Sequence, residues 1–469
     1  MKPVIAFVLI ALLSATVATV EAQDGKTIIA NASKAMGADN LKTVQYSGEG
    51  TEYSFAQAFN RTSGWPAFPL RSYTRTINFE TPAWQIQRMS GEASPTRQGG
   101  GNPGPANQVV IVNANTPWNQ VADYWSTPYG FLRAAATMPV SVKSQTVAGK
   151  KYNVVTFTAP SRARVIGYIN DQNMVEKVET WVDTPLTGDT LLESDYTNYQ
   201  DFAGVKFPMK IVQKQGGYPI LDITVKDVKP NAPAEIQAPQ ARAAAEARPT
   251  TSMKLDEGVY AILPAYSSLA VDFKDYIVVY EGPQSEERAN ATIAEIKRVI
   301  PNKPIRYLIN SHWHIDHSGG LRAFVAEGAT IITHEMNKDW LENVLNAPHT
   351  LNPDRQERVK QKVKIETAGD KKVLTDGNHV IELHHVKGSN HVASLLMAYL
   401  PKQKVLVQAD GFNPPATLGA PVQSRNAGNM LENVERLKLD VETVIPVHYP
   451  ADGRKVTMAE WLKAVGRGN

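Results

Sequence analysis

The sequence predicts an α+β protein with an antiparallel, β-rich N-terminal domain and a C-terminal domain in which strands and helices alternate. Three observations lead to this prediction. Alternating β-branched and aromatic runs dominate residues 44–228. A stretch rich in proline and alanine, typical of a linker, spans residues 229–251. From about residue 252 onward, short apolar runs of strand type alternate with helical patterns, as in a sheet that helices cover.

The first residues of the chain predict an export signal. Lys2 precedes an apolar run from Val4 to Leu13, and small residues follow as far as Ala22. A charged start, a short apolar core and small residues near the cut are typical of a secretory signal peptide. The apolar run is only about half the length that a membrane span of about 20 residues needs. We therefore expect a signal peptide at residues 1–22 and a periplasmic or secreted mature protein without a transmembrane segment.

Composition excludes several kinds of function. The formal net charge is only +3, from 49 basic and 46 acidic residues, so we expect no nucleic-acid partner. A small-molecule substrate is the expected partner. Cysteine is absent, which excludes disulfides, thiolate metal ligands and a cysteine nucleophile. With 469 residues, the chain is long enough for two or three domains.

In the N-terminal domain, expected at residues 23–228, residues 26–36 and 118–136 have helical patterns. Strands with turn signals between them are predicted at 152–157, 165–169, 175–182, 205–212 and 220–228. Residues 98–108 combine three glycines in a row with two prolines, and they predict an exposed loop.

In the C-terminal domain, expected at residues 252–469, the same reasoning gives alternating elements. Strands are predicted at 259–263, 268–273, 276–280, 305–309, 330–333, 372–376, 379–385, 394–400, 404–408 and 443–447. Helices are predicted at 285–299, 321–326, 337–345, 429–437 and 459–465.

All ten histidines lie at or after residue 312, so any metal chemistry is expected in the C-terminal half. His312, His314, Asp316 and His317 fall within six positions, between a predicted strand and the pair Gly319-Gly320. Residues two apart do not share a helix face, so the segment is expected to be a loop at a strand end, where α/β folds hold their chemistry. Imidazole and carboxylate groups bind hard or borderline cations. The alternative is a solvated loop that merely contains histidines.

The pattern His-x-His-x-Asp-His at 312–317 resembles the signature of the metallo-β-lactamase fold superfamily. The resemblance covers roughly residues 252–469 and implies an αβ/βα sandwich. It extends to three downstream positions: His391 before the run 395–401, Asp410 after the run 405–408, and His448 at the end of the run 444–447. Asn and Val flank His391 where the family usually has Gly and Thr, and His384 and His385 are the alternatives for that ligand.

The resemblance implies two divalent metal ions, with zinc favoured and iron or manganese as alternatives. One ion would be held by His312, His314 and His391, and the other by Asp316, His317 and His448, with Asp410 bridging both. A metal-bridged hydroxide would attack an ester, thioester, lactone, amide or phosphoester bond, and Asp316 would be catalytic by orienting the nucleophile or moving a proton. An Asp at position 410 counts against a β-lactamase proper.

Other positions give weaker expectations. Glu281 stands where the family commonly has a buried, supporting Asp, and Tyr449 is a candidate donor to a substrate oxyanion. His334 is expected to be partly buried, and His349 and His379 to lie at the surface. The loops expected to set specificity are 264–275, 346–362 and 411–428.

A different class of function also fits the sequence: a lipid or apolar-ligand carrier. The histidine-free N-terminal domain would bind the ligand, and the metal domain would be accessory. A third alternative is that the N-terminal domain gates the active site or pairs two chains.

Overall fold

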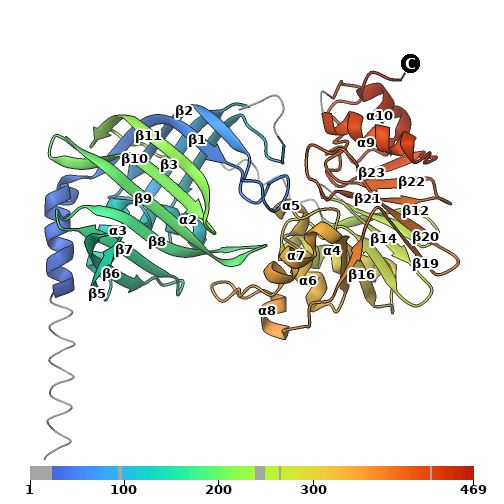
Figure 1. Ribbon diagram of the computed structural model, residues 1–469, viewed down its shortest axis with the longest axis horizontal. Helices are drawn as coiled ribbons and strands as arrows, with labels where there is room; N and C mark the ends of the chain where they lie inside the picture. Colours follow the sequence, from blue (N-terminus) through green and yellow to red (C-terminus); the bar gives the residue numbers. More distant parts are fainter. Residues whose placement is uncertain (1–23, 93–97, 238–248, 264–265, 423–424, 469) are drawn as a thin grey trace, which may run out of the picture.

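The computed structural model describes residues 24–92, 98–237, 249–263, 266–422 and 425–468. Within them the chain forms three sheets of eleven, seven and six strands. Figure 1 shows the eleven-stranded sheet, drawn blue to green, beside the two C-terminal sheets, drawn yellow to red. The predicted signal peptide at 1–22 and residues 238–248 of the predicted linker lie outside the described residues.

The N-terminal sheet is a meander in which every neighbouring pair of strands is antiparallel, with the order β4-β3-β2-β1-β11-β10-β9-β8-β7-β6-β5. Its strands are β1 (Thr43–Tyr53), β2 (Ala67–Asn78), β3 (Ala83–Ser90), β4 (Pro105–Ile111), β5 (Ser141–Val147), β6 (Lys150–Thr158), β7 (Arg164–Asn170), β8 (Val175–Thr184), β9 (Gly188–Phe202), β10 (Val205–Gln215) and β11 (Tyr218–Pro230). Alternating burial along β8 and β9 shows that one face of the sheet forms a core.

That core is shared with the N-terminal helices, which are residues 24–36, η1 (Ala38–Asn40), α2 (Trp118–Trp125) and α3 (Pro128–Thr137). Phe131 of α3 packs with Phe157 and Val178 of the sheet. The single helix predicted at 118–136 is two helices, because Thr127 is extended and its hydroxyl accepts from the Gly130 amide. Pro128 then opens α3, where its missing N–H costs nothing.

The seven-stranded sheet is antiparallel from β12 to β15 and parallel from β15 to β18. Its strands are β12 (Thr251–Asp256), β13 (Val259–Leu263), β14 (Ser268–Asp272), β15 (Ile277–Tyr280), β16 (Ile305–Ile309), β17 (Thr330–His334) and β18 (Ile365–Ala368). The six-stranded sheet consists of β19 (Lys371–Thr375), β20 (Val380–His385), β21 (Leu396–Leu400), β22 (Val405–Gln408), β23 (Thr443–Pro446) and β24 (Val456–Thr457). In it, β22 and β23 are parallel and the other neighbours are antiparallel.

These two sheets share one buried core, in which Val271 and Ile309 of one sheet join Leu383 and Leu396 of the other. A second core lies under the helices that follow β15 and β16, with Ile296 as a member. The C-terminal helices are α4 (Glu286–Val299), α5 (Ile315–Ser318), α6 (Leu321–Ala326), η2 (Glu335–Asn337), α7 (Lys338–Leu345), α8 (Arg355–Val359), α9 (Arg425–Arg436) and α10 (Met458–Ala464). This architecture is consistent with the expected α+β class and with the expected fold of the C-terminal region.

The predicted linker at 229–251 overlaps both neighbouring strands at its ends, because β11 ends at Pro230 and β12 begins at Thr251. The division of the chain into domains at these residues stays a prediction. No helix among the described residues is long and apolar enough to cross a membrane.

Candidate metal centre

The loop that carries three of the histidines is fixed at the carboxyl end of a buried parallel strand. β16 lies between β15 and β17, and the single turn α5 closes the loop. The Asn310 side-chain amide donates to the His312 carbonyl at 2.7 Å, and the Ser318 hydroxyl donates to the same carbonyl at 3.0 Å. All three residues are buried, so the protein's own hydrogen bonds hold the loop backbone in place.

Three further predicted ligands come from strand ends of the six-stranded sheet. His391 precedes β21, Asp410 follows β22, and His448 follows β23. Asp410 has a left-handed backbone with φ of 54°, a conformation that Asp adopts more readily than most residues. The Leu396 amide donates to the Ser311 carbonyl at 2.8 Å and thereby joins the two sheets at the site.

The structure brings all seven predicted ligands together in three overlapping groups, within each of which the ligand atoms lie within 4.8 Å of one another. The groups are His312, His314 and His391; His312, His317 and Asp410; and Asp316, His317 and His448. In the first, His391 Nε2 lies 2.9 Å from His314 Nδ1 and 3.3 Å from His312 Nε2.

Asp410 connects the groups. Its Oδ2 lies 2.6 Å from His317 Nε2 and 3.4 Å from His391 Nε2, and its Oδ1 lies 3.0 Å from His448 Nε2. One carboxylate therefore faces both predicted cation positions, which is the place expected of a bridging ligand.

The donor atoms of this cluster suit divalent cations. Asp410 Oδ2, His317 Nε2 and His448 Nε2 are buried, and although the Asp410 carboxylate lies within 3.0 Å of both imidazoles, none of the three atoms has a well-aligned hydrogen bond among the described residues. A buried polar atom without a partner costs about 1–3 kcal/mol, and a cation among these three would satisfy them together. Nitrogen and oxygen donors without thiolate suit zinc, and also iron or manganese.

Burial and nearby carboxylates set the protonation of the imidazoles. Burial lowers the pKa of His314 to about 3 and lowers the pKa of His312 well below its ordinary value. Burial also opposes the charged form of His317, but the carboxylates of Asp410 and Asp316 raise its pKa well above the ordinary value. Burial thus favours the neutral form of His312 and His314, which is the form that binds a cation, whereas the neighbouring carboxylates favour the protonated form of His317.

Glu281 lies behind His317, and both side chains are fully buried. Glu281 Oε2 is 3.4 Å from His317 Nδ1, and burial raises the pKa of the Glu281 carboxyl. A carboxylate in this place can accept from Nδ1 and keep Nε2 directed at a cation. The geometry is consistent with the supporting role expected for position 281.

Of two tyrosines near the ligands, the one that the sequence did not single out faces the site. The ring centroid of Tyr266 lies 4.8 Å from that of His448, and its hydroxyl is 3.5 Å from Asp316 Oδ2. The Tyr449 hydroxyl is buried and has no hydrogen-bond partner in the part of the chain that the structure describes, and its strongest charged neighbour is Asp452, which is not a predicted ligand. The contacts therefore favour Tyr266 over Tyr449 as a donor at the site.

The β-rich N-terminal part supplies a wall of the site that the sequence did not predict. The connection between β1 and β2, drawn blue, reaches the C-terminal part at α5 (Figure 1). Gln57 Nε2 donates to Asp316 Oδ1 at 2.8 Å, and His314 Nε2 lies 2.9 Å from the Ala58 carbonyl oxygen. We expected the chemistry to be confined to the C-terminal half, which contains all the histidines, but residues of the N-terminal half also contact two predicted ligands. The sequence did not indicate these contacts, because a single amide side chain and a backbone carbonyl form no recognisable pattern.

The prediction of an exposed loop at 98–108 is wrong in two respects. Gly99 and Gly100 are buried, although Gln98 before them is exposed, and residues 105–108 belong to strand β4, although three of these four residues are exposed. The Gly99 amide donates to the Asn390 carbonyl at 2.9 Å. A Cβ on Gly100 would lie only 1.9 Å from Gln57 Oε1. Gly99 and Gly100 are therefore needed for close packing against the site. In a sequence, glycines that allow close packing cannot be told apart from glycines that form a turn.

The remaining histidines lie away from the cluster. His384 is 3.0 Å from a Glu382 carboxylate oxygen, and His385 Nε2 is 2.8 Å from the Ala393 carbonyl oxygen, so neither takes the place of His391. His334 is buried, and His379 is partly exposed.

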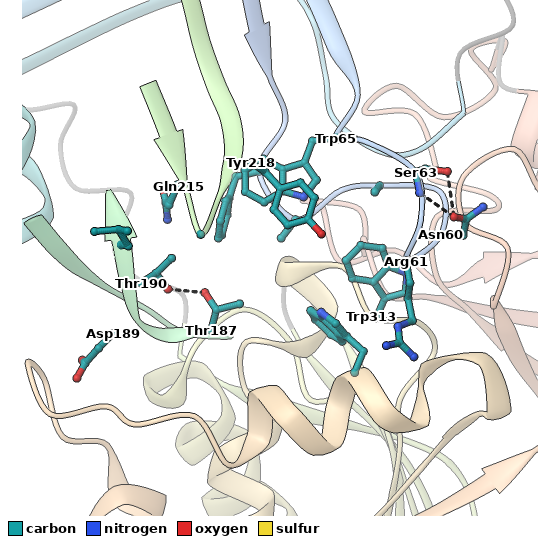
Figure 2. Close-up of a pocket in the computed structure, with 16 residues that line it drawn as sticks. Asn60, Arg61, Ser63, Trp65, Thr187, Asp189, Thr190, Gln215, Tyr218 and Trp313 are labelled. Carbon is teal, nitrogen blue, oxygen red and sulfur yellow. Dashed lines mark hydrogen bonds between the residues drawn. The ribbon is translucent and has the colours of Figure 1, made fainter. Parts of the chain in front are cut away.

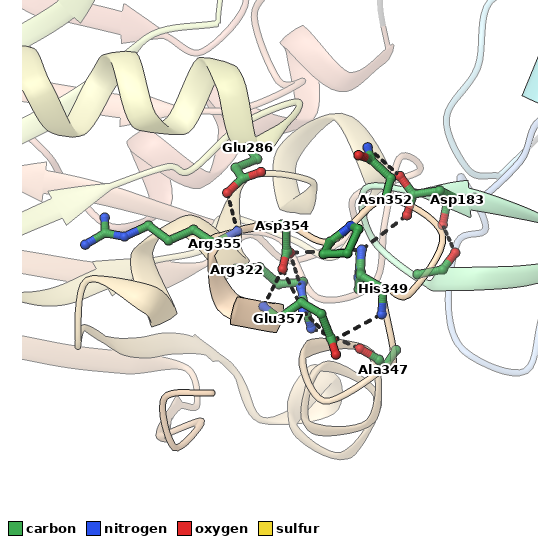
Figure 3. A network of polar contacts seen from close by, with 12 residues as sticks. Asp183, Glu286, Arg322, Ala347, His349, Asn352, Asp354, Arg355 and Glu357 are labelled. Carbon is green, nitrogen blue, oxygen red and sulfur yellow. Dashed lines mark hydrogen bonds and ion pairs between the residues drawn. The ribbon is translucent and has the colours of Figure 1, made fainter. Parts of the chain in front are cut away.

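The prediction that His349 lies at the surface is wrong, because it is 2% exposed. Its Nδ1 is 3.3 Å from Asp183 on β8, and it borders a network in which Arg322 binds Asp354 at 2.5 Å and 3.0 Å (Figure 3). The polar surroundings of His349 in the sequence indicated a loop, and the hairpin of β8 and β9 covers that loop.

A polar cavity of about 790 Å³ opens onto the cluster. Ser54 and Gln57 line it from the N-terminal part, and Tyr266, Asn413 and Arg425 line it from two of the loops expected to set specificity. The third expected loop, 346–362, contacts the β8–β9 hairpin through hydrogen bonds to the Asp189 carboxylate. Specificity is thus expected to depend on N-terminal residues in place of that loop.

Residues 282–448 match the family model of the metallo-beta-lactamase superfamily. No family model matches the N-terminal region. A metallo-beta-lactamase from Pontibacter korlensis is 17% identical with a TM-score of 0.36, covering 46% of this chain and 98% of that chain. The rubredoxin oxygen:oxidoreductase from Desulfovibrio gigas is 16% identical with a TM-score of 0.34, covering 46% and 61%. The stereoselective inverting sec-alkylsulfatase Pisa1 from Pseudomonas sp. is 20% identical with a TM-score of 0.32, covering 44% and 39%. No curated protein matches the sequence.

Proposed function

Because residues 282–448 belong to the metallo-β-lactamase superfamily, we propose that the protein is a metal-dependent hydrolase with a dinuclear, preferentially zinc, centre. The observation that carries the proposal is the convergence of seven imidazole and carboxylate side chains around one bridging carboxylate, at the floor of a polar cavity. The bond cleaved is an ester, thioester, lactone, amide or phosphoester.

The proposed ligands divide between two cations. His312, His314 and His391 would hold one, Asp316, His317 and His448 would hold the other, and Asp410 would serve both. Two cations bound there would lower the pKa of a shared water and polarise a carbonyl or phosphoryl oxygen of the substrate.

The chain's own residues orient the reactants. Asp316 accepts from Gln57 through Oδ1, and its Oδ2 stays directed at the cluster and the cavity. In this place it can accept a hydrogen bond from an attacking water and take up its proton. Tyr266, on the cavity wall, is placed to donate to a substrate oxygen.

We also propose that the protein is exported, on the basis of the signal-peptide pattern at residues 1–22. The mass of the mature chain from a culture expressing the full sequence tests this, and an uncleaved, cytoplasmic chain would contradict it.

A substrate panel tests the catalytic proposal. Chromogenic esters, lactones, thioesters, phosphodiesters and a cephalosporin are assayed with and without a chelator, for the wild type and Asp410→Asn. Asp370→Asn is the matched control, because that carboxylate is 78% exposed and pairs with His385 and Lys387, neither of which is a predicted ligand. We expect turnover of at least one class that the chelator abolishes, that D410N lowers about 100-fold and that D370N keeps. Turnover of no class, or turnover indifferent to the chelator, would overturn the proposal.

A second candidate function has one observation in its favour. A cavity of about 380 Å³ between the N-terminal sheet and the C-terminal part is lined by the rings of Phe55, Trp65, Tyr218, Trp313 and Trp340 (Figure 2). Trp65 and Tyr218 stack with ring centroids 5.0 Å apart. Such a cavity suits an apolar ligand, as expected of a carrier. Lipids extracted from the purified protein and a saturable tryptophan-fluorescence response to a fatty acid would support it, and the absence of both would exclude it.

A further inference from the structure

We propose that the connection between β1 and β2 is a positioning element of the metal centre, in which Gln57 and the Ala58 carbonyl orient two of the ligands. This inference rests on the proposed function, because it assigns those residues a part in holding the cations. It makes the N-terminal part a component of the site.

The first contact fixes the tautomer of His314. A carbonyl oxygen only accepts hydrogen bonds, so the 2.9 Å contact with Ala58 requires the proton of the neutral imidazole on Nε2. Nδ1 is then free to bind a cation, and it lies 2.9 Å from His391 Nε2, inside the first group. His314 and Ala58 are 0% and 2% exposed, so water does not compete for this bond. A partner on the other ring nitrogen is what sets the direction of a metal-binding histidine.

The second contact fixes the carboxylate of Asp316. The Gln57 amide nitrogen can only donate, and it donates a hydrogen bond to Asp316 Oδ1 at 2.8 Å. Oδ2 is thereby left 3.4 Å from His317 Nε2 and 3.8 Å from His448 Nε2, inside the third group. Gln57 therefore contacts the group of Asp316, His317 and His448, whereas Ala58 contacts the group that contains His314.

The connection is held tightly enough to act in this way. The Gly100 amide donates to the Gln57 carbonyl at 2.8 Å, and the Ala393 amide donates to the Phe59 carbonyl at 2.9 Å. The connection thus lies between the Gly99–Gly100 turn and the segment that carries His391.

Its other side faces the aromatic cavity, where the rings of Phe55 and Trp65 pack edge-on with their centroids 4.6 Å apart. Backbone hydrogen bonds on one side and aromatic packing on the other fix the Gln57 amide and the Ala58 carbonyl relative to the ligands.

The test uses the full-length chain and variants at Gln57. The two zinc dissociation constants are measured by competition with a chromophoric chelator for the wild type, Gln57→Ala and Gln57→Glu. We expect Q57A to weaken one of the two constants about 10-fold and to leave the other within two-fold, because the Gln57 side chain donates its hydrogen bond to Asp316, a member of one group of ligands. Q57E keeps the shape but places a carboxylate against Asp316, so it should weaken the same constant further. The melting temperature of the metal-free protein should not change.

A pair of glycine variants tests the connection as a whole. A Cβ on Gly100 would lie 1.9 Å from Gln57 Oε1 and 3.0 Å from His391 Cε1, whereas a Cβ on Gly64 of the β1–β2 connection meets nothing within 4 Å. We expect Gly100→Ala to weaken both constants about 10- to 100-fold and Gly64→Ala to weaken neither. In a ¹⁵N spectrum the His314 ring should show the Nε2–H tautomer in the wild type and lose it in G100A.

Three outcomes decide the inference. Zinc constants within two-fold of the wild type in Q57A and Q57E, or equal losses in G64A and G100A, would overturn it and leave the metal centre standing. A wild type that binds no zinc would overturn both the inference and the proposed function. Selective weakening by Q57A with an unchanged metal-free melting temperature supports it.

Discussion

Replacing Glu281 by glutamine is expected to move metal affinity and metal-free stability in different directions. The side chains of Glu281 and His317 are both 0% exposed, with Oε2 3.4 Å from Nδ1, and neither Glu281 oxygen has a well-aligned hydrogen bond. The Glu281 carboxylate thus lies next to the ring nitrogen of His317 that does not face the cluster, and it is also a buried acidic group that water does not reach. Glu281→Gln removes the charge and keeps the shape of the side chain.

The expected magnitude follows from these two roles. Loss of the carboxylate behind a ligating histidine typically weakens metal binding about 10- to 100-fold, which is about 1.4–2.8 kcal/mol. In the metal-free protein, burial already raises the pKa of Glu281 and disfavours its charged form. An uncharged amide there has no charge to desolvate, and the Asp410 and Asp316 carboxylates remain beside His317, so the free energy of unfolding should stay the same or increase.

Chelator competition measures the affinity, and urea unfolding of the metal-free protein measures the stability. Glu281→Asp is the control, since it keeps the carboxylate and Asp tolerates the local φ of 77°. E281D should bind zinc more tightly than E281Q. Zinc binding by E281Q equal to that of the wild type, together with a lower metal-free stability, would refute the reasoning and make Glu281 a structural residue only.

Three further predictions concern single side chains. Arg322→Met should lower the free energy of unfolding by about 3–5 kcal/mol, because it leaves the Asp354 carboxylate without its buried partner; a loss below about 1 kcal/mol in urea denaturation would contradict this. Burial lowers the pKa of His334 from 6.5 to about 4. The unfolded chain therefore takes up a proton on this residue first, so the contribution of His334 to the stability of the metal-free protein is complete above pH 6.5 and falls toward pH 4 by up to about 3 kcal/mol. His334→Asn should flatten that fall, and equal pH profiles for variant and wild type would contradict it. Tyr266→Phe should lower kcat about 100-fold on the substrate that the panel identifies, whereas Tyr449→Phe should not change it; the reverse order would show that the wrong tyrosine was assigned.

The sequence predicted the site where the evidence was local and periodic. The spacing of His312, His314 and His317 after an apolar run indicates a loop at a strand end, and β16 ends at Ile309 directly before it. The amphipathic run 285–299 predicted α4 to within one residue, because Ser285 is a side-chain cap at its start.

The sequence could not predict contacts that join distant segments through the backbone. Gln57 and Asp316 are 259 residues apart, and nothing in a run of loop residues marks one amide as a partner of a carboxylate. Gly100 and His349 were misjudged for the same physical reason. Glycine-rich and polar segments indicate exposure on average, but here another part of the chain buries each of them.

The metal content of the purified full-length protein tests the central claim most directly. Elemental analysis after expression with trace zinc, iron and manganese, followed by removal with a chelator and reloading, gives the identity and number of bound ions. We expect two divalent ions per chain, preferentially zinc, and the loss of at least one of them in Asp410→Asn. A wild-type chain that holds no ion and takes none up on reloading would contradict the account.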